Sequence, residues 1–154
     1  MFDDLYNNRV LELAADIPHV GRLENPDGSA TKTSKLCGSV VTVDVAIRDG
    51  IVTDFAIDPK ACALGQASAA VLAAHAIGAT VGEINDARDG LRLMLKDNGR
   101  PPEGRFWELR YLEGVRDYAP RHASTLLAFE AACAALSEAG QATAQGDYRI
   151  FRFA

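Results

Sequence analysis

Cys37 and Cys62 are the residues of this chain best placed to do chemistry. Cys37 ends a loop rich in Asn, Pro, Gly, Ser and Thr, and Cys62 opens an alanine-rich segment 25 residues later. A thiolate is the form of cysteine that binds metal or attacks sulfur, and a helix N-terminus favours it through its dipole and free N–H groups. Free cysteines are also often small core residues, and the spacing alone leaves both interpretations open.

The segment between the two cysteines has the pattern of a β-hairpin. Apolar and polar residues alternate over 41–48 and again over 51–58, which is typical of strands with one buried face. Asp49–Gly50 is a two-residue turn signal, because Gly tolerates the positive φ of such turns. On the second strand we expect one face to carry Ile51, Thr53, Phe55 and Ile57. A hairpin returns the chain to its start, so both thiols should lie at the same end of the sheet.

Helices are expected around this hairpin. The apolar spacing, caps and stops predict them over 3–15, 62–78, 80–96 and 121–139, with Thr80 and Glu83 as a capping box. Residues 25–39 are predicted to be a loop, and 106–115 has helical apolar spacing over a short length. We therefore predict an α+β domain, with a small antiparallel sheet of about three strands and helices packed on one face.

The chain is expected to form a single domain over residues 1–140. Its 154 residues fit the usual size of one domain, and no linker or internal repeat divides them. The tail, residues 141–154, is polar at first and ends in YRIFRFA, which is consistent with an added strand or a disordered end. Its role stays open.

The remaining cysteine and the histidines are expected to be less reactive. Cys133 falls on an apolar helical stripe with Leu126, Phe129 and Leu136, which predicts a core cysteine. His75 is interpreted as a core or boundary residue and His19 as a surface loop residue. His122 begins the last predicted helix and is the histidine of most interest.

Composition excludes several classes of function. The net charge is −5 (16 Lys+Arg against 21 Asp+Glu) and no basic run occurs, which argues against nucleic-acid binding. No apolar stretch is long enough to cross a membrane, and the acidic, amphipathic N-terminus is unlike a secretion signal. Three cysteines without tight spacing argue against a secreted disulfide framework, so we expect reduced thiols and a cytoplasmic location.

Four segments together resemble the U-type iron–sulfur cluster assembly proteins, which are NifU N-terminal or IscU-like. They are LYNNRVLELAADIPHVGRLENPDG, LCGSVVTVDVAIRDGIVTDFAI, ACALGQASAAVLA and FWELRYLEGVRDYAPRHASTLLAFEA. They occur in the family's order over about residues 5–137. The last segment is characteristic of the SufU-type branch, so the resemblance implies an IscU/SufU-like fold.

The resemblance also implies a ligand set. The family holds zinc or an assembling iron–sulfur cluster with three cysteines and an aspartate. Its first two cysteines match Cys37 and Cys62, whereas Ser39 stands at the aspartate position and Ser124 at the third cysteine position. Cys133 cannot replace that third cysteine, because nine residues place it on the opposite side of a helix and about 13 Å along its axis. His122 is a weak candidate for a third ligand beside the two cysteines.

By resemblance, the chain is a carrier rather than a turnover enzyme, although sulfurtransferase activity is compatible with the SufU-type branch. Cys37 and Cys62 would act as thiolate ligands or persulfide carriers. The implied partners are a SufS-like, pyridoxal-phosphate-dependent cysteine desulfurase and apo iron–sulfur proteins, and the chain would be a monomer or weak homo-oligomer. Two alternatives stay open, because two ligand positions are serines: a non-metal docking or regulatory module on the same fold, and a two-thiol redox protein.

Overall fold

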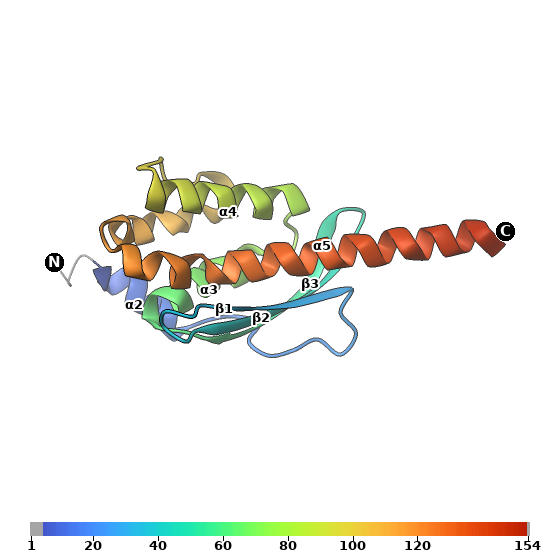
Figure 1. Cartoon of the computed structure of the whole chain (residues 1–154), viewed down its shortest axis with the longest axis horizontal. Coiled ribbons are helices and arrows are strands. Elements are labelled where there is room, and N and C mark those ends of the chain that lie inside the picture. The colour runs from blue at the N-terminus through green and yellow to red at the C-terminus, as the bar shows by residue number, and fades with distance from the viewer. Residues whose placement is uncertain (1–4, 154) are drawn as a thin grey trace.

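The computed structural model describes residues 5–153, with side chains described as far as Gly140. Its centre is an antiparallel sheet in the order β1-β2-β3, formed by Gly28–Thr33, Val40–Arg48 and Ile51–Lys60. Helices cover one face of this sheet (Figure 1). This architecture confirms the predicted α+β fold.

The central hairpin confirms the predicted turn and corrects one strand face. Asp49 and Gly50 have φ values of 55° and 76°, as a primed two-residue turn requires. The β2–β3 register shifts between Ala46 and Ile47, so that Thr53 has no partner in the ladder. This bulge moves Val52 to the buried face and leaves Ile51 exposed, so the predicted shared face of Ile51 with Phe55 is wrong.

Strand β1 lies within the predicted loop over 25–39, and that prediction is wrong for six residues. Gly28–Thr33 pairs with β2 over its whole length, from Gly28 opposite Val45 to Thr33 opposite Val40. A Cβ at Gly28 would collide with the carbonyl oxygen of Ala135 in the last helix. Glycine therefore lets the edge strand pack closely against that helix, and tertiary packing rather than local pattern forms the strand.

The first three helices begin at recognisable caps. Helix α2 (Asn8–Ala15) starts where the Asn7 side chain accepts from the Val10 N–H, and the predicted acidic first turn at 3–4 lies outside the described residues. Helix α3 (Ala63–His75) has Cys62 as its N-cap. Helix α4 (Val81–Lys96) has the predicted capping box of Thr80 and Glu83. The helices predicted over 62–78 and 80–96 are thus confirmed with small changes at their ends.

The segment predicted to have helical spacing over 106–115 is a 3₁₀-helix, η1 (Gly104–Asp117). Its buried apolar side chains recur every third residue, which matches the three residues per turn of this helix. They are Phe106, Leu109, Leu112 and Val115. A short second 3₁₀-helix, η2 (Ala119–Arg121), leads into the last helix.

Helix α5 (His122–Phe153) does not end at Gly140 as predicted. The backbone of 141–153 is helical, so the expectation of an added strand or a disordered end is wrong for those residues. The segment contains no proline, and a single glycine costs a helix only about 1 kcal/mol. The C-terminal end of α5 projects past the sheet (Figure 1).

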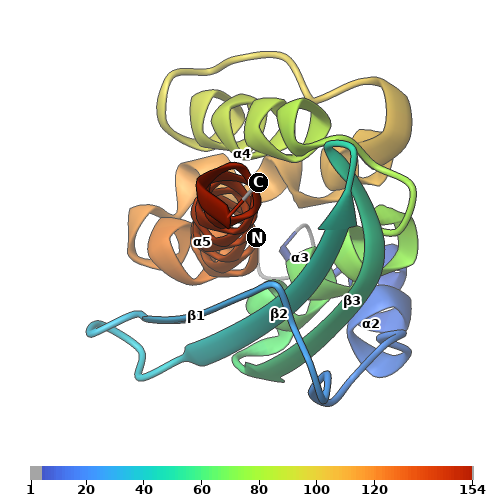
Figure 2. The same ribbon diagram turned by 90° about the vertical axis from the view of Figure 1, so that its right-hand side faces the viewer.

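The core lies between the sheet and the helices. Helix α5 packs on β1 and β2, α3 packs on β3, α4 stacks on α5 and α2 stacks on α3. Figure 2, viewed nearly along α5, shows α4 on one side of this helix and β1 and β2 on the other. Across residues 5–153, none of the helices combines the length and apolar character that a bilayer crossing needs.

One buried carboxylate connects three helices. Glu108 on η1 accepts from Arg9 of α2 at 2.8 Å and contacts the Nε2 of His75, at the end of α3, at 2.9 Å. Burial raises the pKa of Glu108, but the bonds to His75 and Arg9 outweigh it and hold the pKa below its usual value. His75 is therefore a boundary residue, as predicted, and His19 is an exposed loop residue.

Candidate functional site

The loop between β1 and β2 carries Cys37. Its two ends are joined by a hydrogen bond of 2.8 Å from the Ser34 N–H to the Ser39 carbonyl, and the Gly38 N–H donates to the Ser34 carbonyl at 2.8 Å. Gly38 has φ +74°, a conformation that favours glycine. The loop is thus a closed turn that holds the exposed Cys37 at its tip.

Hydroxyl groups surround the Cys37 sulfur. Its Sγ lies 3.4 Å from the Ser34 Oγ and 3.1 Å from the Ser39 Oγ. Hydroxyls can donate to a thiolate, so Ser34 first and then Ser39 lower the pKa of Cys37 to about 7. The lowered pKa favours the thiolate of Cys37, in a position open to solvent.

Cys62 lies where β3 passes into α3. It has extended backbone angles (φ −68°, ψ 171°) as the N-cap residue, and its carbonyl accepts from the Gln66 N–H at 2.8 Å. The half-buried Cys62 thiol donates to the Ser124 Oγ at 3.6 Å. A Cβ at Gly65 would lie 3.1 Å from the Ser124 carbonyl oxygen, so the lack of a side chain there lets α3 approach α5 closely.

Ser124 connects the two cysteines. This residue is buried in the first turn of α5, where its hydroxyl donates to the Arg121 carbonyl at 3.2 Å. Besides contacting Cys62, the same hydroxyl helps to lower the pKa of Cys37. The structure thus brings Cys37, Cys62, Ser39 and Ser124 together at one end of the sheet, although their ligand roles stay predictions.

Two other candidates, His122 and Cys133, have hydrogen-bond partners outside this group. The His122 Nε2 lies 3.1 Å from the Val115 carbonyl and 3.0 Å from the Arg116 carbonyl. That nitrogen therefore carries a proton and is not free to bind metal. Cys133 is a buried residue as predicted, and its thiol points to the Ile84 carbonyl at 3.9 Å. Burial raises the pKa of Cys133 to about 11, so this thiol stays neutral.

The donor set does not fit a resident zinc ion. A structural zinc site uses four ligands drawn from Cys, His and carboxylates. Here two thiols face two neutral serine hydroxyls, and among the residues that the structure describes no group of three or more His, Cys, Asp or Glu could hold a metal. The two cysteines supply only two of the four ligands that such a site needs.

The comparison with known families identifies the fold. The profile of the NifU-like N-terminal domain matches residues 5–95, more than half of the chain and including Cys37 and Cys62. The chain belongs to the NifU-like N-terminal domain family. The match ends within α4, so Ser124 lies beyond it.

Three relatives of this NifU-like chain cover nearly all of it. The N-terminal NifU-like protein from Brucella abortus, a crystal structure, is 54% identical and has a TM-score of 0.89 over 91% of this chain and 97% of its own. The iron–sulfur cluster assembly scaffold protein IscU from Thermotoga maritima is 23% identical over 84% of this chain and 91% of its own length. A proposed SUF-system scaffold from Fervidobacterium islandicum, 20% identical over 84% of this chain and 94% of its own, shares the fold with a TM-score of 0.77.

Ser34 is a residue of the site that the sequence motifs do not single out. The signal was present, since a serine three residues before Cys37 in a short loop is positioned to turn back toward it. The closed geometry of the loop depends on the pairing of β1 with β2, and β1 itself was not predicted.

Proposed function

We propose that this NifU-like chain acts in iron–sulfur cluster assembly, as a scaffold or sulfur acceptor that uses Cys37 and Cys62. One observation carries this proposal: Val40 pairs with Lys60, so the strand ends next to Cys37 and Cys62 lie side by side, and the Ser124 hydroxyl contacts the Cys62 thiol there. The name of the relative from Thermotoga maritima, an iron–sulfur cluster assembly scaffold protein, supports the same activity. The SufU-type branch is favoured by the segment FWELRYLEGV.

Sulfur acceptance needs only the groups that the site contains. The Cys37 thiolate attacks the outer sulfur of a donor persulfide, so that a new S–S bond forms as the donor's S–S bond breaks. The bonding electrons leave with the donor sulfur as a thiolate, and no external oxidant or reductant is needed. Ser34 and Ser39 favour this step by holding Cys37 as a thiolate.

An iron–sulfur cluster is the cargo in this proposal. Cys37 and Cys62 supply two thiolate ligands, and a second chain or an acceptor protein supplies the others while the cluster is assembled or passed on. The sulfur donor is a pyridoxal-phosphate-dependent cysteine desulfurase, and the acceptors are apo iron–sulfur proteins. We place this activity in the cytoplasm, where thiols stay reduced.

The test is to purify the protein without oxygen and incubate it with a cysteine desulfurase and cysteine. Sulfane sulfur, iron, sulfide and zinc are then measured per chain in the wild type, in Cys37→Ser, in Cys62→Ser and in the double variant. Cys133→Ser is the matched control, because that thiol is buried and neutral. We expect the wild type and the Cys133→Ser control to carry sulfane sulfur or iron, and the double variant to carry neither.

The same experiment separates the alternatives. If no sulfur or metal binds under any condition, the proposal fails and a docking or regulatory module on this fold is supported. If the wild type instead forms a reversible disulfide between Cys37 and Cys62, and carries neither persulfide nor metal, the two-thiol redox function is supported.

A further inference from the structure

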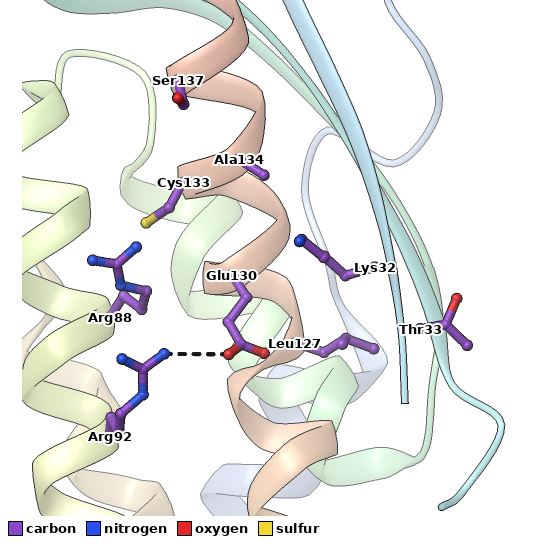
Figure 3. A pocket seen from close by; sticks show the side chains of 9 residues that line it. All are labelled: Lys32, Thr33, Arg88, Arg92, Leu127, Glu130, Cys133, Ala134 and Ser137. Carbon is purple, nitrogen blue, oxygen red and sulfur yellow. Dashed lines mark hydrogen bonds and ion pairs between the residues drawn. The ribbon is translucent and has the colours of Figure 1, made fainter. Parts of the chain in front are cut away.

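A groove lies between α4, α5 and β1, and none of the groups of the thiol site lines it. Its volume is about 390 Å³, within the range of small-molecule sites. Figure 3 shows α5 as its floor, with Arg88 and Arg92 projecting from α4 on one side and Lys32 from β1 on the other. Three cations from two separate elements therefore face one cavity.

The groove has an excess of positive charge on an acidic protein. Its lining has three cationic side chains and one carboxylate, that of Glu130, whereas the whole chain has a net charge of −5. Glu130 pairs with Arg92 at 3.3 Å. Among the side chains that the structure describes, Lys32 has no ionic partner, so its charge is available to a ligand.

Arg88 also keeps donors for a ligand. Its Nε is paired with Asp89 at 3.0 Å, and its guanidinium lies beside the Cys133 sulfur (Figure 3). Burial keeps that thiol neutral, so it adds no negative charge to compete with a bound anion. The hydroxyl of Ser137 on α5 adds a neutral donor to the lining.

We propose that this groove binds a phosphate dianion, either as inorganic phosphate or as the phosphate group of a monoester. Planar guanidinium groups match the oxygens of a phosphate in paired hydrogen bonds, and a lysine adds a point charge. Asp89 pairs with Arg88 at 3.0 Å and lies 3.9 Å from Arg92, so with Glu130 counted as well the three cations keep one net positive charge. Their several N–H donors suit the oxygens of a phosphate group. The volume leaves room for a substituent on the phosphate, and the bound group would join the edge strand β1 to α4.

The test is a titration of the full chain with inorganic phosphate, followed by NMR of the backbone amides and the arginine Nε–H groups. It is done at constant ionic strength and about pH 8, where phosphate is mainly dianionic. We expect saturable shifts in β1, α4 and α5 around the groove. Lys32→Met, Arg88→Gln and Arg92→Gln should each weaken binding by about two- to fivefold, the range of exposed charge pairs.

Matched controls separate the groove from general charge. Lys96→Met and Arg48→Gln remove exposed cations elsewhere and should leave phosphate binding unchanged. Glu130→Gln removes the competing carboxylate and should tighten binding about two- to fivefold, a gain that structural damage would not produce. Shifts that do not saturate, controls that weaken binding as much as groove variants, or no tightening in Glu130→Gln would overturn the proposal.

A second arm distinguishes the two sources of the phosphate group. Adenosine 5′-monophosphate is titrated under the same conditions. If it shifts the same arginine and lysine signals as inorganic phosphate with equal or higher affinity, the site takes phosphate monoesters. If only inorganic phosphate binds, the site takes the free ion, and both results support the dianion site.

Discussion

The Oγ of Ser124 lies 3.6 Å from the Sγ of Cys62, although 62 residues separate them in the chain. The resemblance to the U-type assembly proteins predicts that Ser124 stands at the position of their third cysteine. Its hydroxyl also helps to lower the pKa of Cys37. Ser124 thus gives the Cys62 thiol a neutral hydrogen-bonding partner.

The reactivity of Cys37 should follow its lowered pKa. We expect its alkylation by iodoacetamide, measured by mass spectrometry of the Cys37 peptide, to have a midpoint at a pH of about 7. Ser34→Ala should move that midpoint upward, toward the ordinary value of 9.0, because it removes the largest cause of the shift. Ser137→Ala, an exposed serine of α5, is the control. An unchanged midpoint in Ser34→Ala would contradict the role of that hydroxyl.

The same shift makes stability depend on pH. The pKa of Cys37 is lower in the folded protein than in the unfolded chain, so the thiolate's stabilising contribution is present in full above about 9 and is lost as the pH falls through about 7. Urea unfolding over this pH range measures the free energy of unfolding of the wild type and of Cys37→Ser. The difference between the two free energies should shrink toward the acidic end. A constant difference across the range would be the contrary result.

Restoring the family's donors should create a zinc site. We expect the double variant Ser39→Asp, Ser124→Cys to bind zinc in competition with a chelator. Its zinc-binding free energy should approach that of structural zinc sites, about 10–16 kcal/mol at pH 7. The wild type should lose zinc to the same chelator. The control variant Ser39→Asp, Ser137→Cys also adds a carboxylate and a thiol, but its thiol lies outside the site. Tight zinc binding by this control would contradict the placement of residue 124 beside the two cysteines.

Gly28 should be needed for the packing of β1 on α5. Gly28→Ala places a Cβ against the Ala135 carbonyl and 2.7 Å from the Ala139 nitrogen, and should cost roughly 1–3 kcal/mol of unfolding free energy. Gly140→Ala faces open space on the same helix and should stabilise the protein by about 0.5–1 kcal/mol. Urea unfolding measures both, and equal effects of the two variants would argue against the close contact.

Glu108 should stabilise the contact between α2, α3 and η1. Glu108→Gln weakens its bonds to Arg9 and His75 in a buried setting and should cost about 1–3 kcal/mol. Because its pKa is lowered on folding, this contribution is present above the carboxylate's unfolded-state pKa and is lost as the pH falls through the folded value. Glu113→Gln, in an exposed pair with Arg116, is the control and should cost less than about 1 kcal/mol.

The sequence predicts those parts of the fold that have strong local signals. Alternation and Asp49–Gly50 are enough for the β2–β3 hairpin, and Thr80 with Glu83 is enough for the start of α4. The bulge at Thr53 is not visible locally, because alternation does not show where an extra residue is inserted. Strand β1 has little apolar alternation and depends on pairing with β2 and on the close approach of α5 at Gly28.

The candidate site also has parts that the sequence predicts and parts that it does not. The placement of Cys37 and Cys62 at one end of the sheet follows from hairpin geometry, because they flank strands whose outer ends pair at Val40 and Lys60. The place of Ser124 came only from the family resemblance, since α5 is distant in sequence. Ser34 was missed because its approach to Cys37 depends on the bonds that close the β1–β2 loop. Long-range contacts of this kind are set by tertiary structure.

The proximity of the two sulfurs is tested most directly with dibromobimane, a short reagent that fluoresces strongly only after it has joined two neighbouring thiols. The experiment uses Cys133→Ser, so that Cys37 and Cys62 are the thiols present. We predict strong fluorescence in this folded protein after it is reduced and the reductant is removed without oxygen. The fluorescence should be lost when Cys37→Ser or Cys62→Ser is added or when urea unfolds the chain. Weak fluorescence in the folded two-thiol protein, with both cysteines shown by mass spectrometry to have reacted singly, would contradict a shared site.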